Sequence, residues 1–121
     1  MIGIGTDLVE IERFRRVMGR TPGIVERLFR TDERAYAARK SDPAPSLAVR
    51  FAAKEAVMKA LGPGIGGIAM RDIEVVRAEH GEPSVRLHAA AAALAADRGV
   101  TRWLLTLTHT DTMAQAIAVA L

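Results

Sequence analysis

Residues 50–62 read RFAAKEAVMKALG, and this stretch decides the fold because its apolar positions recur with the period of an α-helix. Six apolar residues fall on one arc of a helical wheel drawn at about 100° per residue: Val49, Ala52, Ala53, Ala56, Val57 and Ala60. Gly62 ends the pattern, as glycine commonly does at a helix C-terminus. The stretch therefore predicts a helix with one buried face and with its charged residues outside that face.

The four charged residues of this helix have two interpretations. Glu55 and Lys59 lie one turn apart on the side opposite the apolar arc, whereas Arg50 and Lys54 share a flank. A solvent-exposed Glu-to-Lys pair with this i, i+4 spacing stabilises a helix by about 0.2–0.5 kcal/mol. The alternative is that the four charges form half of a binding site for a highly charged ligand.

Residues 1–7, MIGIGTD, alternate in the manner of a short strand. One face carries Ile2, Ile4 and Thr6, and the other carries Gly3, Gly5 and Asp7. Glycine on the second face leaves room for a bulky group to approach the strand. Asp7 itself has two interpretations: an N-cap of the helix that follows, or a carboxylate that binds a ligand.

The remaining segments predict one α+β domain over residues 1–121. Helices are expected over residues 8–18, 24–29, 32–40 and 89–99. Strands are expected over residues 72–77, 84–88, 102–109 and 114–121. Ser46 is expected to cap the central helix, and residues 62–70 form a glycine-rich connection. The order is one strand, three or four helices, two strands, one helix and two strands, which is typical of a mostly antiparallel sheet packed with helices.

Composition narrows the class of protein. The formal net charge is +3, and 14 of the 17 basic residues are Arg, whose planar guanidinium suits phosphate and carboxylate ligands. The absence of cysteine excludes disulfides and thiolate metal sites. We find no secretory leader and no run of about 18 apolar residues, so we expect a cytoplasmic protein that does not span a membrane. The apolar residues are mostly small, and such a thin core favours packing against other subunits.

Asp7 and Glu55 together suggest a metal site. Each has a simple structural explanation alone, but one lies at a glycine-lined strand end and the other on a helix flanked by three cations. Mg²⁺ takes oxygen ligands and is commonly shared between one or two carboxylates and the phosphates of a substrate. The surrounding Arg and Lys side chains would then bind the remaining phosphate charge, which favours a polyphosphate ligand.

Four motifs resemble the holo-acyl-carrier-protein synthases, the short single-domain members of the 4'-phosphopantetheinyl transferase superfamily. They are GIGTDLVEIER at residues 3–13, RFAAKEAVMKALG at 50–62, DIEVVR with GEPSVRL at 72–77 and 81–87, and LTLTHT at 105–110. The first two motifs are highly specific at this separation, and the resemblance covers nearly the whole chain. It implies transfer of the phosphopantetheine arm of coenzyme A to a serine of apo acyl carrier protein, with release of adenosine 3',5'-bisphosphate.

The resemblance also assigns roles to individual residues. Asp7 and Glu55 match the ligands of Mg²⁺, with Mn²⁺ as the alternative ion, and the metal would bridge them to the pyrophosphate of coenzyme A. Lys59 matches the lysine that reaches the pyrophosphate and stabilises the leaving group, while Arg50 and His109 match positions at the nucleotide end of the cofactor. The general base is Glu55 or a metal-bound water, and we favour Glu55.

His109 has a second interpretation. It follows Trp103, Leu105 and Leu107 at strand period, so a hydrogen-bonded histidine at the rim of the core is the alternative to a phosphate ligand. The glycine-rich GPGIGG at residues 62–67 follows a helix and lacks the Gly-Lys-Ser/Thr ending, so it is not a nucleotide-binding loop.

Basic residues near the N-terminus suggest a docking surface. Arg13, Arg16 and Arg20 form one stripe opposite the face that carries Ile11, Phe14 and Met18. Such a stripe is either a solvated face or, as the resemblance implies, a contact surface for an acidic carrier protein. Arg13 and Arg20 match the family's carrier contacts best, and Arg27 is a weaker third.

The resemblance further implies a homotrimer whose active sites lie between subunits. The turn at residues 80–83 would reach a neighbour's cofactor, although Glu82 stands where relatives often carry a basic or neutral residue. Two other function classes fit the sequence less well. Nucleic-acid binding is disfavoured because the aromatic residues are scattered and no known fingerprint is present. A noncatalytic module that docks an acidic carrier protein is the alternative, but it leaves Asp7 and Glu55 without a role.

Overall fold

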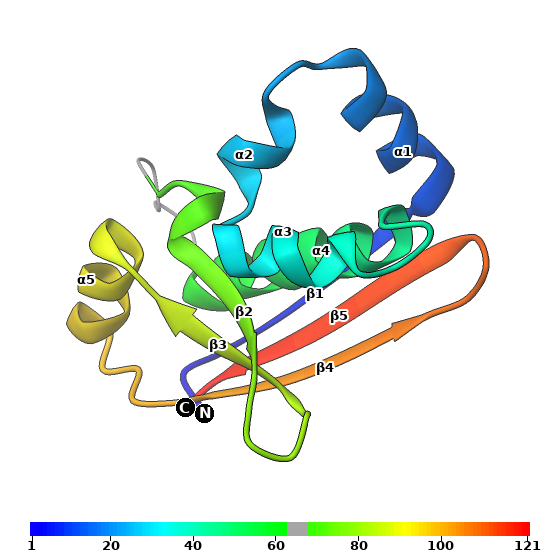
Figure 1. The fold of residues 1–121 in the computed structure, drawn as a ribbon. Coiled ribbons are helices and arrows are strands. Elements are labelled where there is room, and N and C mark those ends of the chain that lie inside the picture. Colours follow the sequence, from blue (N-terminus) through cyan, green and yellow to red (C-terminus); the bar gives the residue numbers. More distant parts are fainter. Residues whose placement is uncertain (63–67) are drawn as a thin grey trace.

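The computed structural model describes residues 1–62 and 68–121 (Figure 1). In chain order its elements are β1 (Gly3–Glu10), α1 (Ile11–Arg20), α2 (Ile24–Leu28), α3 (Thr31–Ala38), α4 (Ala44–Leu61), the 3-10 helix η1 (Met70–Asp72), β2 (Ile73–Arg77), β3 (Pro83–Leu87), α5 (Ala89–Asp97), β4 (Trp103–His109) and β5 (Met113–Ala120). This arrangement confirms the predicted α+β class. None of the described helices is long and apolar enough to cross a membrane.

The strands form two antiparallel sheets. The larger has the order β1-β5-β4, and β2 and β3 pair separately as a hairpin. The first and last strands are neighbours, with Gly3 opposite Ala120, so the two chain ends lie together (Figure 1). The prediction of a mostly antiparallel sheet is confirmed, with the difference that the strands divide into two sheets.

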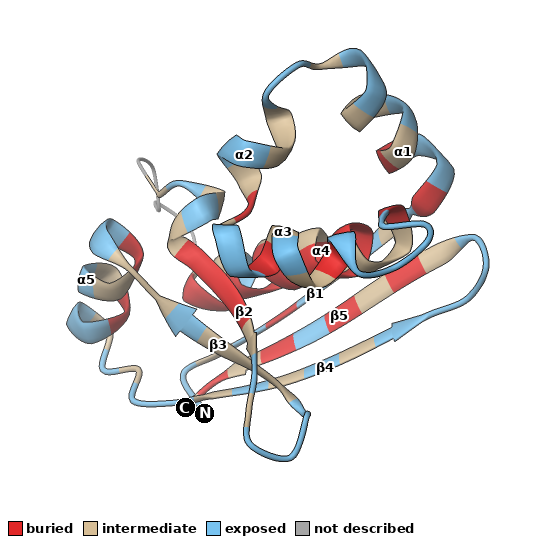
Figure 2. Ribbon diagram, in the orientation of Figure 1, coloured by how far each residue is buried: buried red, intermediate tan, exposed pale blue. Residues whose placement is uncertain are grey.

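Helix α4 packs directly on the inner face of β1, and all six residues of the predicted apolar arc are buried (Figure 2). Two glycines make this close approach possible. A Cβ atom added at Gly5 would lie 2.0 Å from the carbonyl oxygen of Ala56, and one added at Gly3 would lie 1.9 Å from that of Ala60. The bulky group that approaches β1 at Gly3 and Gly5 is therefore the backbone of α4.

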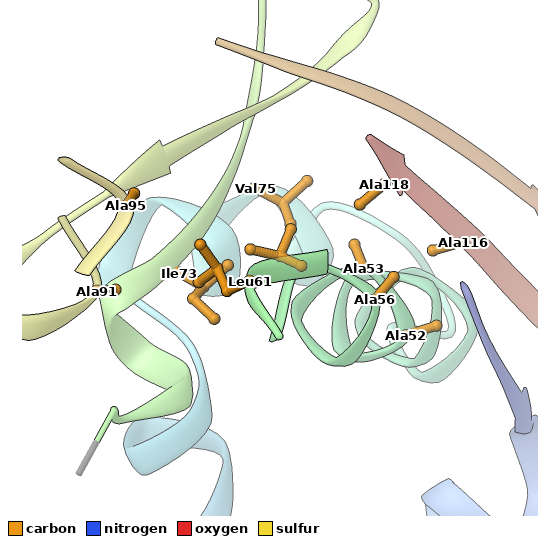
Figure 3. Packing of buried hydrophobic residues seen from close by; sticks show 11 residues of the cluster. Ala52, Ala53, Ala56, Leu61, Ile73, Val75, Ala91, Ala95, Ala116 and Ala118 are labelled. Carbon is orange, nitrogen blue, oxygen red and sulfur yellow. The ribbon is translucent and has the colours of Figure 1, made fainter. Parts of the chain in front are cut away.

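Small residues dominate the core beneath α4. Figure 3 shows Ala52, Ala53 and Ala56 of α4 beside Ala116 and Ala118 of β5. Short side chains allow helix and strand to approach closely at interior packing density. A second cluster, between α1 and α4, is built around Phe14, Phe29 and other large residues.

Two predictions about helix starts are wrong. β1 continues to Glu10 because Leu8 and Val9 pair with β5, so α1 begins at Ile11 and Asp7 lies inside the strand, where it caps no helix. Ser46 does not cap α4; the Asp42 carboxylate accepts the N–H of Ala44 at 3.2 Å instead. Of the predicted connection, residues 63–67 lie outside the described part of the chain.

Candidate active site

Asp7, Glu55 and Lys59 meet where β1 crosses α4. Asp7 follows Gly3 and Gly5 on the inner face of the strand, and Glu55 and Lys59 are one turn apart on the helix. The Lys59 ammonium donates to the Thr6 carbonyl oxygen at 2.8 Å and lies 3.3 Å from Asp7 Oδ1. The close glycine packing thus places residues from sequence positions 7 and 59 in direct contact.

Glu55 lies in the electrostatic field of this pair. Burial raises the pKa of Glu55, the negative charge of Asp7 raises it further, and Lys59 acts in the opposite direction. Two carboxylates close enough to perturb each other are a reasonable donor set for a hard cation. No third His, Asp or Glu completes a cluster in residues 1–62 and 68–121. Mg²⁺ is commonly held by one or two protein carboxylates together with phosphates and water, and a pair of carboxylates fits that pattern.

A groove of about 600 Å³ opens beside these carboxylates. Asp7, Glu55 and Arg13 line it together with the ring of Phe51. Further apolar lining comes from α1 and α2: Phe14, Val17, Ile24 and Leu28. The groove thus connects the acidic pair to the helices that carry the predicted docking arginines.

Arg50 and His109 line a second cavity, of about 620 Å³. Arg50 is only 4% exposed; its Nη1 donates to the Ser46 hydroxyl at 2.8 Å, and its Nε has no hydrogen-bond partner among the described residues. Burial lowers the pKa of Arg50. A buried guanidinium without a bonded carboxylate suits an anionic ligand, because an uncompensated buried charge is costly. His109 is exposed at the rim of the same cavity, with Nδ1 3.3 Å from the Thr110 carbonyl oxygen.

The two cavities face different sides of α4. Arg50 and Glu55 are five residues apart, which in an α-helix corresponds to about 7.5 Å along the axis and roughly 140° around it. The structure therefore brings together Asp7, Glu55 and Lys59 in one place and Arg50 and His109 in another.

The interpretation of Lys54 as a phosphate-binding cation is wrong. Lys54 is fully buried and pairs with the Glu33 carboxylate at 2.8 Å. Its ammonium also donates to the carbonyl oxygens of Met70 and Ile73. Burial lowers the pKa of Lys54, and Glu33 opposes that shift. With Glu33 also accepting the N–H of Val75 at 2.9 Å, the pair ties α3 and β2 to α4.

The predicted docking arginines are on the surface. Arg13, Arg16 and Arg20 of α1 and Arg27 of α2 are exposed, and within the described part of the chain their side chains make no ion pair. Arg15 on the same helix differs, because it bonds Asp42 at 2.6 Å and Glu12 at 3.1 Å. Four cations of α1 and α2 thus remain available to a partner.

Sequence reasoning missed three residues of the Arg50 cavity: Tyr36, Lys40 and Arg77. Tyr36 is the only tyrosine of the chain and lies on α3, whereas Arg77 ends β2, 41 positions later. Tyr36 belongs to no motif, and Arg77 ends the DIEVVR motif, to which the resemblance assigned no ligand. The one available signal was the unusual presence of a lone tyrosine between several Arg and Lys residues.

The comparisons with known proteins define the family. The sequence model of the 4'-phosphopantetheinyl transferase superfamily matches residues 3–120. A holo-[acyl-carrier-protein] synthase of Clavibacter michiganensis subsp. michiganensis is 53% identical over 117 residues, covering 97% of this chain and 92% of its own. The crystal structure of holo-[acyl-carrier-protein] synthase from Neisseria meningitidis superimposes with a TM-score of 0.89 at 30% identity, covering 99% and 98% of the two chains.

A further similar structure contains a ligand. The Helicobacter pylori holo-[acyl-carrier-protein] synthase, in complex with coenzyme A, matches with a TM-score of 0.83 at 27% identity, covering 97% of this chain and 98% of its own. Fold, motifs and relatives define a phosphopantetheinyl transferase domain. Within that superfamily, the chain belongs to the holo-acyl-carrier-protein synthases.

Proposed function

We propose that this protein transfers 4'-phosphopantetheine from coenzyme A to a serine of apo acyl carrier protein and releases adenosine 3',5'-bisphosphate. The observation that carries the proposal is the convergence of Asp7, Glu55 and Lys59 at the crossing of β1 and α4. Relatives that are named for this activity, one of them in complex with coenzyme A, support it. The reaction would prepare carriers for fatty acid biosynthesis.

Asp7 and Glu55 would hold Mg²⁺, or Mn²⁺ in its place. When bound, the ion neutralises charge on the pyrophosphate oxygens as the phosphoanhydride bond breaks. Lys59 would bind the same pyrophosphate with the ammonium that contacts Asp7 and the Thr6 carbonyl, and would stabilise the leaving phosphate. Its side chain is 55% exposed, so it can turn from Asp7 towards a ligand.

Glu55 would accept the proton of the carrier serine. The serine oxygen forms a bond to the phosphorus that carries the pantetheine arm, and the bond from this phosphorus to the oxygen of the adenosine-side phosphate breaks. Burial and Asp7 raise the pKa of Glu55 in the metal-free site, whereas a bound cation would lower it, so the support for Glu55 as the base is its position beside Asp7 in the groove.

Arg50 and His109 would bind the nucleotide end of coenzyme A. Arg50 supplies a buried guanidinium whose Nε is free of hydrogen-bond partners in the described structure, and His109 supplies an exposed ring at the rim of the same cavity. Arg13, Arg20 and Arg27 would attract the acidic carrier protein. Attraction of this kind mainly raises the association rate and weakens with salt.

We further propose a homotrimer with active sites shared between subunits. The outer face of the β1-β5-β4 sheet exposes Ile4, Leu8 and Leu104 at 59%, 60% and 52%, with Ile117 between them. An apolar surface of this kind marks a protein contact. A neighbouring subunit could then bring an Arg50 cavity to the Asp7 and Glu55 pair of the first. Light scattering in solution should give three chains, and a monomer would contradict this.

One experiment tests the activity directly. The protein is incubated with apo acyl carrier protein, coenzyme A and Mg²⁺, and the carrier is examined by intact-mass spectrometry. A phosphopantetheine-sized mass gain supports the proposal. No gain, together with firm carrier binding, would instead support the noncatalytic docking module. Cytoplasmic location is part of the proposal, because both substrates of the reaction would be met there.

A further inference from the structure

One aromatic ring in the Arg50 cavity contacts four cations. The Tyr36 ring centroid lies 4.3 Å from the guanidinium carbon of Arg50 and 4.7 Å from that of Arg77. The Arg39 guanidinium carbon is at 4.9 Å and the Lys40 ammonium at 5.3 Å. Each distance is within the roughly 6 Å at which a cation is attracted to the ring. Like charges so close repel one another, so the ring offsets part of that cost.

The four cations differ in their other hydrogen bonds and in whether they line the cavity. Arg50 is anchored to Ser46, and Arg77 donates from Nη1 to the Gly81 carbonyl oxygen at 2.6 Å. Arg50 comes from α4 and Arg77 from the end of β2, and both guanidinium groups lie against the ring of Tyr36 on α3. Arg50, Arg77 and Lys40 line the cavity of His109, whereas Arg39 lies outside it.

The pKa of the Tyr36 hydroxyl reflects the positive charges that surround it. Burial raises the pKa of Tyr36, but the charges of Arg77, Lys40 and Arg50 outweigh burial and lower it overall. The carboxylate of Asp42 at the cavity edge is already bonded to Arg15 at 2.6 Å. The cavity thus presents several cations around one ring and suits a compact dianion such as a phosphate monoester.

We propose that Tyr36 is a positioning residue, which holds the guanidinium groups of Arg50 and Arg77 facing this cavity so that the enzyme selects the 3'-phosphate of coenzyme A. This inference rests on the proposed function, since it assumes coenzyme A as the substrate. Tyr36 does not touch the reacting atoms. Its ring fixes two cations from separate elements, and these bind the phosphate farthest from the reaction.

The test compares coenzyme A with 3'-dephospho-coenzyme A as substrates. Tyr36→Phe keeps the ring, and Tyr36→Leu removes it while keeping apolar volume. Tyr36→Leu should raise KM for coenzyme A about tenfold, which corresponds to about 1.4 kcal/mol, with kcat within about twofold. KM for 3'-dephospho-coenzyme A should stay unchanged. Tyr36→Phe keeps the ring but loses the hydroxyl that interacts with Arg77, so its KM for coenzyme A should rise less than that of Tyr36→Leu. A general structural role would affect the two substrates alike.

Two arginines provide a check that does not depend on the folding of Tyr36→Leu. Arg77→Gln should reduce the preference for the 3'-phosphate, whereas Arg39→Gln, outside the cavity, should not. Equal losses with both substrates in Tyr36→Leu, or an Arg77→Gln enzyme with its full preference, would overturn the inference. An unmodified enzyme that uses both substrates equally would also overturn it while leaving the proposed function intact. Only failure to transfer at all would refute that function.

Discussion

Replacing Gly5 by alanine tests the way in which the fold assembles the site. The new Cβ would lie 2.0 Å from the Ala56 carbonyl oxygen and 2.8 Å from the Ala60 backbone nitrogen, whereas ordinary contact begins near 3.4 Å. Both opposing groups are backbone atoms of α4, so no side chain can rotate away. β1 must therefore move from the helix by more than 1 Å.

That displacement has two calculable consequences. Overpacking a well-filled core costs about 1–3 kcal/mol of unfolding free energy. Asp7 lies two residues beyond Gly5 and would move away from Glu55 and Lys59, and a misplacement of about 1 Å in an active site can cost about 100-fold in rate. We expect Gly5→Ala to lose activity even under conditions in which it is fully folded.

Urea unfolding and a transfer assay under saturating substrates measure the two effects. Gly19→Ala in α1 is the matched control, since a Cβ there meets nothing within 4 Å. The control should keep full activity, and its stability should be unchanged or higher by up to about 1 kcal/mol. A Gly5→Ala enzyme with normal stability and normal kcat would refute the claim that glycine at this position is needed for α4 to pack against β1.

Three other changes have definite expected outcomes. Lys54→Met should lower the unfolding free energy by about 3–5 kcal/mol because it leaves a buried carboxylate unpaired; a loss below 1 kcal/mol in urea unfolding would be inconsistent with that role. Arg13→Glu combined with Arg20→Glu should raise KM for the carrier protein, most at low salt, without weakening coenzyme A binding; equal losses in both would argue against docking there. Asp7→Asn should lower the pKa of Glu55, measured by carboxyl NMR titration without metal, and an unchanged pKa would mean that the two groups are not neighbours.

Periodicity predicted the central helix and its buried arc correctly. It could not predict the burial of Lys54, because a helical wheel gives the direction of a side chain and not the depth of what packs over it. The flank shared by Arg50 and Lys54 is covered by α3, which precedes α4 in the chain, and by β2, which follows it. Partners such as Glu33 become visible only after folding.

Some residues of the candidate site could be predicted from the sequence, and others could not. Asp7 and Glu55 stood out because acidic residues beside glycines and cations are unusual, and their motifs resembled a known family. Tyr36 lies in no motif, and the motif that ends in Arg77 gave that residue no role. The contact between them depends on where β2 passes α3. The start of α1 was misplaced because the residues after Asp7 fit both helical and strand periods, and pairing with β5 decided between them.

The central claim is that Asp7 and Glu55 share one divalent cation with the pyrophosphate of coenzyme A. Anomalous diffraction from crystals grown with coenzyme A and Mn²⁺ measures this directly. The account predicts one anomalous peak that both carboxylates and a pyrophosphate oxygen coordinate. A peak elsewhere, or carboxylates that bind no metal while the cofactor is present, would contradict it.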